Sequence, residues 1–322
     1  SLDINQSIYD GGISKNRQDL ENIAVKLEKS QLAIDIRTSG MLVKDLYFSI
    51  LLIQKNQEII DLSLEQLLQN RNIVESGIKN GILLNSDLDL IDVEIVKMRQ
   101  TKLELENSRI TGLQSLSIKI GVPVENDIIL LPTNFTSPEN DSINRLELML
   151  FDIQNEQLDK SKSLIKSRSL PKLYAFGQFG YGNPGLNMLK DEFDTYYVVG
   201  AGLKWTIWDW KVSNRDRQVL GLQQNLIVNS KSQFEREIST ALINQRAVIR
   251  NHKENITAYE SILQLRSNIT RVSKSQLENG IIKTLDYISA LNQETIARIQ
   301  VENEKMNHQK AIAKYLEING EL

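Results

Sequence analysis

The chain has 322 residues, a net charge of −3, few aromatic residues and no cysteine. The absence of a basic excess argues against nucleic-acid binding, and the absence of cysteine excludes thiol catalysis, disulfides and cysteine-ligated zinc. The longest apolar run, Leu46 to Ile53, is interrupted by Ser49 and reaches about a third of the roughly 20 residues that a membrane-spanning helix needs. A helical membrane protein is therefore not expected. Membrane strands are not excluded by this observation, because they alternate apolar and polar residues and contain no long apolar run.

The first nine residues alternate apolar and polar side chains, which predicts a strand over residues 1–9. Because the sequence starts inside a strand, we expect a fragment that lacks an N-terminal segment. A helix is expected from about Ser14 to Asn80, since no proline precedes Pro123. Polar Gln57 and Arg71 interrupt its heptad stripe. The apolar members of that stripe are Ile53, Ile60, Leu64, Leu67, Val74 and Ile78.

Gly81 is the expected C-cap of this helix, and the chain then returns as a shorter helix that ends near Gly121. The return helix repeats the heptad spacing with Leu88, Ile91, Ile95, Met98 and Leu105. The first helix would be on the order of 100 Å long and needs neighbours to cover its apolar stripe. The two helices together predict an antiparallel coiled-coil hairpin.

All five prolines lie between residues 123 and 184, in a middle region of different character. It contains a linker over 122–141, a helix from about Ser142 to Arg168 and two candidate strands over 171–183 and 195–209. The last strand has an apolar face opposite a face of glycine, lysine and threonine, as in a strand with lipid on one side and water on the other. An ordinary sandwich strand would alternate in the same way. The cluster of Trp205, Trp208 and Trp210 favours the membrane interface.

The final part of the chain, over 213–279 and 284–319, repeats the order of long helix, glycine and shorter helix. Sequence landmarks recur 199 residues apart, since Asp10 corresponds to Asp209 (209 − 10) and Gly81 to Gly280 (280 − 81). A fixed offset indicates two equivalent units. We expect a first repeat over 1–121, a linker over 122–141 and a second repeat over 142–322. The counterpart of the helix at 142 would precede residue 1, so the first repeat should lack its first helix and strand.

The sequence gives little support for catalysis. His252 and His308 are the only histidines. No carboxylate recurs at a fixed spacing from them, and both are expected to be solvated helix residues. The segment Gly177–Gly182 has nucleotide-loop spacing but lies in an aromatic strand without a following helix, so a phosphate cradle is not expected. Gly182–Gly185 has turn composition. We therefore expect neither an enzyme nor a cofactor nor a metal.

The duplicated order of strand, Trp-Asp boundary, long helix, glycine turn and return helix resembles the TolC-like outer-membrane efflux protein family, over essentially the whole chain. Four groups of residues carry this resemblance. They are Asn144-Arg145-Leu146-Glu147-Leu148 with Ser169-Leu170-Pro171-Lys172-Leu173, Val199-Gly200-Ala201-Gly202-Leu203 with Ile207-Trp208-Asp209-Trp210, Leu277-Glu278-Asn279-Gly280 with Asp286, and Lys79-Asn80-Gly81 with Asp87.

The resemblance implies a mainly α protein with a β-barrel portion, in which long antiparallel coiled-coil helical hairpins continue the membrane strands. In that family three protomers each give four strands to one barrel, whereas this chain shows three strands. The implied function is a passive exit duct in the outer membrane with a periplasmic tunnel. Its expected partners are a periplasmic adaptor, an inner-membrane pump and outer-membrane lipid, in drug efflux or type I secretion. The alternatives are a periplasmic adaptor and a coiled-coil scaffold without a channel.

The resemblance also assigns candidate site residues. Asp286 is expected in an acidic ring at the periplasmic mouth, with Asp87 and Asp89 as further candidates and Ser289 where the family often has a second acid. The alternative for these acids is stabilisation of a helix N-terminus. The resemblance further implies adaptor-docking tips, for which the alternative is simple capping of the coiled-coil end. These tips are Gly81, Ile82, Leu83, Gly280, Ile281 and Ile282. It also implies an aromatic girdle of Tyr9, Trp205, Trp208 and Trp210, for which the alternative is burial between barrel and tunnel.

Overall fold

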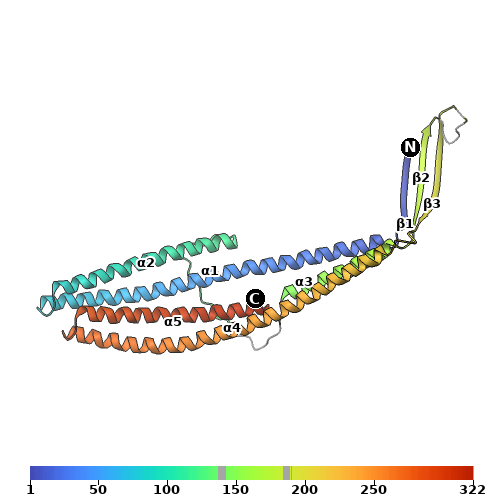
Figure 1. The fold of residues 1–322 in the computed structure, drawn as a ribbon. Coiled ribbons are helices and arrows are strands. Elements are labelled where there is room, and N and C mark those ends of the chain that lie inside the picture. The colour runs from blue at the N-terminus through green and yellow to red at the C-terminus, as the bar shows by residue number, and fades with distance from the viewer. Residues whose placement is uncertain (137–142, 184–188, 190, 322) are drawn as a thin grey trace. The chain divides into compact units, whose positions relative to one another are not determined.

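The computed structural model describes residues 1–136, 143–183, 189 and 191–321 (Figure 1). Within them the protein is mainly helical and has one three-stranded sheet. The elements in chain order are β1 (Leu2–Tyr9), α1 (Ile13–Lys79), α2 (Asn85–Ile120), α3 (Leu146–Arg168), β2 (Lys172–Gly182), β3 (Asp194–Lys204), α4 (Val212–Glu278) and α5 (Thr284–Asn319). The predicted turn at Gly182–Gly185 lies largely outside the described residues.

The helix bounds repeat the offset found in the sequence. α4 begins and ends 199 residues after α1 (212 − 13 and 278 − 79), and α5 begins and ends 199 residues after α2 (284 − 85 and 319 − 120). Both return helices end at a glycine in the left-handed region, Gly121 and Gly320. The expected long-helix, glycine, shorter-helix order is thus present twice. The proposed division at residues 121 and 141 stays a prediction.

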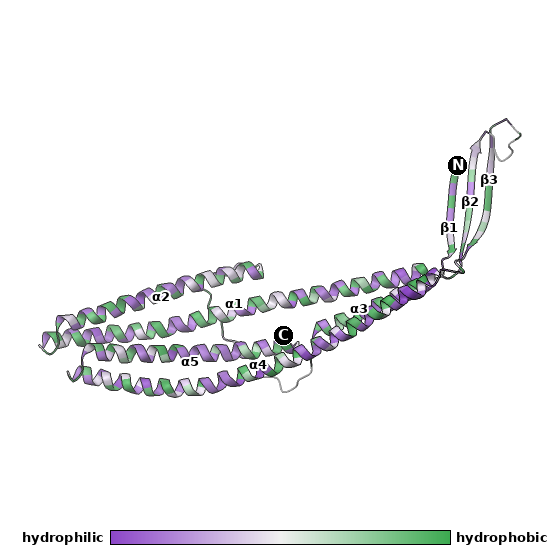
Figure 2. Cartoon of the chain, in the orientation of Figure 1, coloured by the Kyte–Doolittle hydropathy of each residue, from purple (hydrophilic) through white to green (hydrophobic). Residues whose placement is uncertain are grey.

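By compactness the chain divides into two units, which cut across the repeats. The first unit comprises residues 1–35 and 145–237, and the second comprises 36–144 and 238–322. Helices α1 and α4 therefore each contribute to both units. Hydrophobic and hydrophilic residues are interleaved along every long helix (Figure 2), as expected where only one stripe of a helix is apolar.

The first unit contains an antiparallel sheet of order β1-β2-β3. Asp10 and Asp209 occupy equivalent positions before α1 and α4, and each carboxylate accepts the backbone N–H groups of the residues two and four positions further along. Hydrogen bonds from Ser14 and Ser213 respectively lower the pKa of these two carboxyl groups. α3 is joined to α1 through Lys160, whose ammonium lies 2.9 Å from a carboxylate oxygen of Asp19.

The third strand is shorter than predicted. β3 ends at Lys204, so the expectation of a strand to residue 209 is wrong. The indole N–H of Trp205 donates to the carbonyl oxygen of Ser169 at 3.0 Å. Trp210 and Lys211 have φ values of 53° and 64°. A strand cannot pass through the left-handed region, so the chain turns into α4 here.

The second unit is built on the predicted heptad stripes. One core cluster joins all four long helices, and its buried members are Ile60, Leu67, Val74, Ile91, Ile95, Met98, Leu277, Tyr287, Ile288 and Leu291. Leu64, Ile78, Leu88 and Leu105 pack against this cluster while partly exposed. Both polar interruptions of the first stripe have partners: Gln57 donates to Glu106 at 2.6 Å, and Arg71 pairs with Asp92 at 2.6 Å.

Candidate functional site

The two turns that join the long helices, residues 80–84 and 279–283, lie at the same end of the second unit (Figure 1). Their central glycines have matching φ values, 74° at Gly81 and 67° at Gly280. Each glycine N–H donates to a carbonyl three residues back, on Ile78 at 2.9 Å and on Leu277 at 3.0 Å. A β carbon at Gly280 would lie 3.0 Å from a methyl carbon of Ile82, so the two turns touch.

Acidic residues begin the return helices in the same way. A carboxylate oxygen of Asp87 accepts the N–H of Leu84 at 3.0 Å, and one of Asp286 accepts the N–H of Lys283 at 3.3 Å. Each acid therefore satisfies a backbone donor at a helix N-terminus, where negative charge is also favoured. Asp89, Asp286 and Ser289 are exposed. Their surroundings are compatible with both capping and a charged mouth.

The apolar residues of the turns divide into two groups. Ile82 and Ile281 are 61% and 70% exposed. Leu84 is 71% exposed as well. Leu83 and Ile282 instead pack against the core cluster, so the expectation that all five apolar turn residues are exposed is wrong for these two. A turn of five residues cannot direct every side chain outward, and the inward ones close the end of the core.

The four residues expected in an aromatic girdle belong to the first unit, where β1 and β3 end. Tyr9, Trp205, Trp208 and Trp210 are all at least half exposed, from 51% for Tyr9 to 77% for Trp210. Tyr9 pairs with Leu173 in the sheet. The rings of Trp208 and Trp210 contact each other edge to face, with their centroids 5.9 Å apart. Within the described chain these rings form an exposed aromatic group.

A row of polar contacts, which we call the polar seam, joins the two helical hairpins of the second unit. Tyr287 is 1% exposed, and its hydroxyl accepts a hydrogen bond from the side-chain amide of Asn70. Burial raises the pKa of Tyr287, and Glu294 and Glu278 add to this effect. Ser63 and Thr295 join their hydroxyls at 2.8 Å, and the amide of Asn292 donates to Glu94 at 2.9 Å.

Sequence reasoning missed the polar seam. A partial signal was present on α1, because Ser63 and Asn70 are separated by one heptad (70 − 63 = 7). Such a spacing places both side chains on one helix face. The partners on α5 could not be assigned, since periodicity gives the face of a helix but not the residue that it meets.

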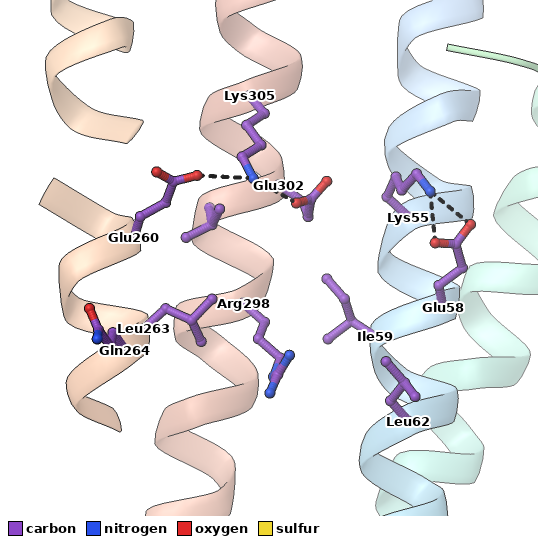
Figure 3. A pocket seen from close by; sticks show the side chains of 11 residues that line it. Lys55, Glu58, Ile59, Leu62, Glu260, Leu263, Gln264, Arg298, Glu302 and Lys305 are labelled. Atoms are coloured by element: carbon purple, nitrogen blue, oxygen red, sulfur yellow. Dashed lines mark hydrogen bonds and ion pairs between the residues drawn. The ribbon is translucent and has the colours of Figure 1, made fainter. Parts of the chain in front are cut away.

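A groove of about 470 Å³ lies among α1, α4 and α5 (Figure 3). Lys305 bridges Glu260 at 3.1 Å and Glu302 at 3.5 Å, while Arg298 pairs with Glu294. Figure 3 shows the Arg298 side chain reaching from α5 toward Ile59 of α1. The groove combines apolar walls with charges that are already paired.

The two histidines differ from the expectation. His252 Nδ1 on α4 lies 2.7 Å from a carboxylate oxygen of Glu304 on α5, a pairing that the sequence pattern did not predict. His308 lies one turn further along α5 and is half-buried. Burial lowers its pKa, and the nearby His252 and Lys253 lower it further. The pairing depends on which faces of α4 and α5 meet, which a single-helix pattern does not reveal.

The described residues contain no cluster of three or more histidine, aspartate or glutamate side chains arranged to hold a metal ion. In the same part of the chain, no helix has both the length and the apolar character that membrane spanning requires.

Comparison with known sequences gives no relationship, because no protein-family model and no curated protein matches this chain. Comparison with solved structures shows a shared fold. The outer membrane protein VceC of Vibrio cholerae superposes with a TM-score of 0.77 at 11% identity, covering 99% of this chain and 78% of that one. The MtrE outer membrane channel of Neisseria gonorrhoeae, in its open state, gives a TM-score of 0.75 at 13% identity over 98% of this chain and 74% of that one.

The Campylobacter jejuni CmeC outer membrane channel gives a similar result, a TM-score of 0.74 at 13% identity over 99% of this chain and 70% of that one. The matches span both compact units and nearly the whole chain. At 11–13% identity they establish the arrangement of the backbone. The chain therefore has the fold of the TolC-like outer-membrane channels.

Proposed function

We propose that this protein is the outer-membrane exit duct of an efflux or type I secretion system. The observation that carries the proposal is a channel fold over 98–99% of the chain, combined with a sheet of two unlike faces. One face is largely apolar, and the other, which we call the polar face, carries the polar residues of β1 beside glycines and aromatic rings. Three copies would assemble so that their strands form a barrel in the outer membrane and their helices form a periplasmic tunnel. Transport would be passive, with energy supplied by an inner-membrane pump.

The chemistry of the sheet supports this placement. Paired residues of an antiparallel sheet share a face, and Ile4, Val199 and Leu203 lie on one face with exposures of 60%, 74% and 67%. Asn5 and Ser7 lie on the opposite face. Lipid would contact the apolar face, and water would fill the space before the polar one. The exposed aromatic group around Trp208 would then lie at the membrane interface.

The hairpin turns would form the periplasmic mouth. Three copies of exposed Asp286 around a narrow opening would attract cations, and Asp87 and Asp89 would add to this field. Ser289 is neutral, so positions 286 and 289 together would contribute one negative charge per protomer to the ring. Exposed Ile82 and Ile281 beside Gly81 and Gly280 would contact the helical tips of a periplasmic adaptor. The half-buried Leu83 and Ile282 would support that surface from beneath.

The first test is the mass of the full-length protein extracted from membranes. A trimer that requires detergent to stay in solution is expected, because three apolar sheet faces must be covered. A monomer or dimer that stays soluble without detergent would contradict the duct and favour an adaptor or a scaffold. Reconstitution in a planar bilayer then tests conduction, and the absence of any conductance would also contradict it.

The charge of the mouth is tested by Asp286→Asn in the conducting trimer. The asparagine side-chain oxygen can still accept the Lys283 N–H, so capping is retained while the charge is removed. We expect lower cation selectivity and weaker block by divalent cations. Asp87→Asn is the matched control, since it makes the equivalent change on the other hairpin and should have the smaller effect. Equal effects of both variants would contradict the special role of Asp286.

A further inference from the structure

Three aromatic rings on the sheet each face a glycine on the neighbouring strand. The register of β2 and β3 pairs Tyr174 with Gly202, Phe176 with Gly200, and Gly180 with Tyr196. Because directly paired residues share a face and their spacing along each strand is even, all three pairs lie on the same face. β1 adds Asp3, Asn5 and Ser7 to that face.

The rings occupy the space above the glycines. A β carbon added to Gly200 would lie 2.6 Å from the tip of the Phe176 ring, closer than real contacts allow. At Gly202 and Gly180 the rings of Tyr174 and Tyr196 lie closer still. Each aromatic side chain therefore leans sideways over its neighbouring strand, with its far end above a glycine.

Gly177 provides the contrast on the opposite face of β2. A β carbon there would meet Val199 at 3.7 Å, an ordinary van der Waals contact. Among these four glycines, only the three on the polar face therefore have an aromatic ring close above them. An aromatic side chain that leans onto a glycine projects less far from a sheet than one that stands upright beside a bulkier residue.

We propose that Gly180, Gly200 and Gly202 are positioning residues that keep the channel wide at its strand end. Because these glycines have no side chain, the aromatic rings can lie over them. The rings then project less far from the sheet into the water-filled space. A methyl group at any of these positions would push the ring away from the sheet and so toward the channel axis. This inference rests on the proposed function, because it requires the polar face to line a channel.

The test uses the conducting wild-type trimer in a planar bilayer with polyethylene glycols of graded size, added to one side at a time. Polymers that enter a channel reduce its conductance, so the largest effective polymer reports the width of the entrance on that side. Gly200→Ala is expected to shift this cut-off to smaller polymers from one side only. Gly177→Ala is the matched control and should leave both cut-offs unchanged. Equal cut-offs in all three proteins would overturn the inference.

Two further variants keep the test decisive if Gly200→Ala does not assemble. Phe176→Ala removes the ring and should leave the cut-off on that side unchanged or larger. The double variant Phe176→Ala with Gly200→Ala should keep the wild-type cut-off or a larger one, because no ring remains to be displaced. A smaller cut-off in Phe176→Ala would overturn the inference while leaving the duct intact. A wild-type protein without conductance would instead overturn the proposed function itself.

Discussion

Two kinds of contact hold the second unit together, and they differ in chemistry. The core cluster around Leu67 and Ile91 is apolar, and both of these side chains are fully buried. The polar seam through Asn70, Tyr287 and Glu94 joins the hairpins by hydrogen bonds. Apolar contacts contribute most of the free energy of folding but little directionality, whereas buried hydrogen bonds contribute less and fix one arrangement. The core therefore sets the stability of the helices, and the seam sets how the hairpins align.

The largest expected effect comes from the core. Leu67→Ala removes a side chain that is 0% exposed, so the free energy of unfolding should fall by about 2–5 kcal/mol. Urea unfolding of the detergent-solubilised protein, followed by helical circular dichroism, measures this change. Leu62→Ala on the same helix is the control, because Leu62 is 53% exposed and its loss should cost much less. Similar losses for both variants would contradict the assignment of the core.

The seam should give an intermediate effect. Tyr287→Phe removes one buried hydroxyl, and we expect a loss of about 1–3 kcal/mol. The Asn70 amide retains its bond to the Gln66 carbonyl oxygen, so it is not left without an acceptor. A double-mutant cycle with Asn70→Ala isolates the interaction between the two side chains. A coupling energy of zero would show that Tyr287 acts through packing alone.

Acid should weaken the contact between α4 and α5 through His308. Its pKa is lowered from the ordinary value by burial first and then by His252 and Lys253. As the pH falls through about 6.5, the unfolded chain binds the proton before the folded protein does, so stability decreases. The urea concentration at half-unfolding should be lower at pH 5.5 than at pH 7.5. This difference should be smaller in His308→Gln than in the wild-type protein. An unchanged difference would assign the acid sensitivity to other groups.

The smallest effect is expected at the surface of the same unit. Lys55 pairs with Glu58 at 2.8 Å, but the two side chains are 36% and 61% exposed. Exposed ion pairs contribute little, so Lys55→Met should change the free energy of unfolding by no more than about 0.5 kcal/mol. The same urea assay provides the measurement. A loss comparable to that of Tyr287→Phe would show that the groove beside Lys55 contributes more than its exposure suggests.

Sequence periodicity predicted the elements well and their partners poorly. The stripe from Ile60 to Val74 identified the buried face of α1, because a helix places residues seven apart on one side. Strand alternation likewise identified the two faces of β3. The end of β3 was missed, since Trp205, Thr206 and Ile207 continue the alternation of the strand, while Trp210 and Lys211 turn the backbone. Local turn geometry outweighed alternation at that point.

The sequence alone determined the two equivalent helical hairpins, the glycine turns and the lipid-like alternation of the strands. These features are local, because they follow from helix and strand periods and from the freedom of glycine at positive φ. The tertiary structure decided the pairs that are distant in sequence: Asn70 with Tyr287, His252 with Glu304, and Phe176 above Gly200. Each of those pairs depends on the register between two elements, and no period within a single element encodes that register.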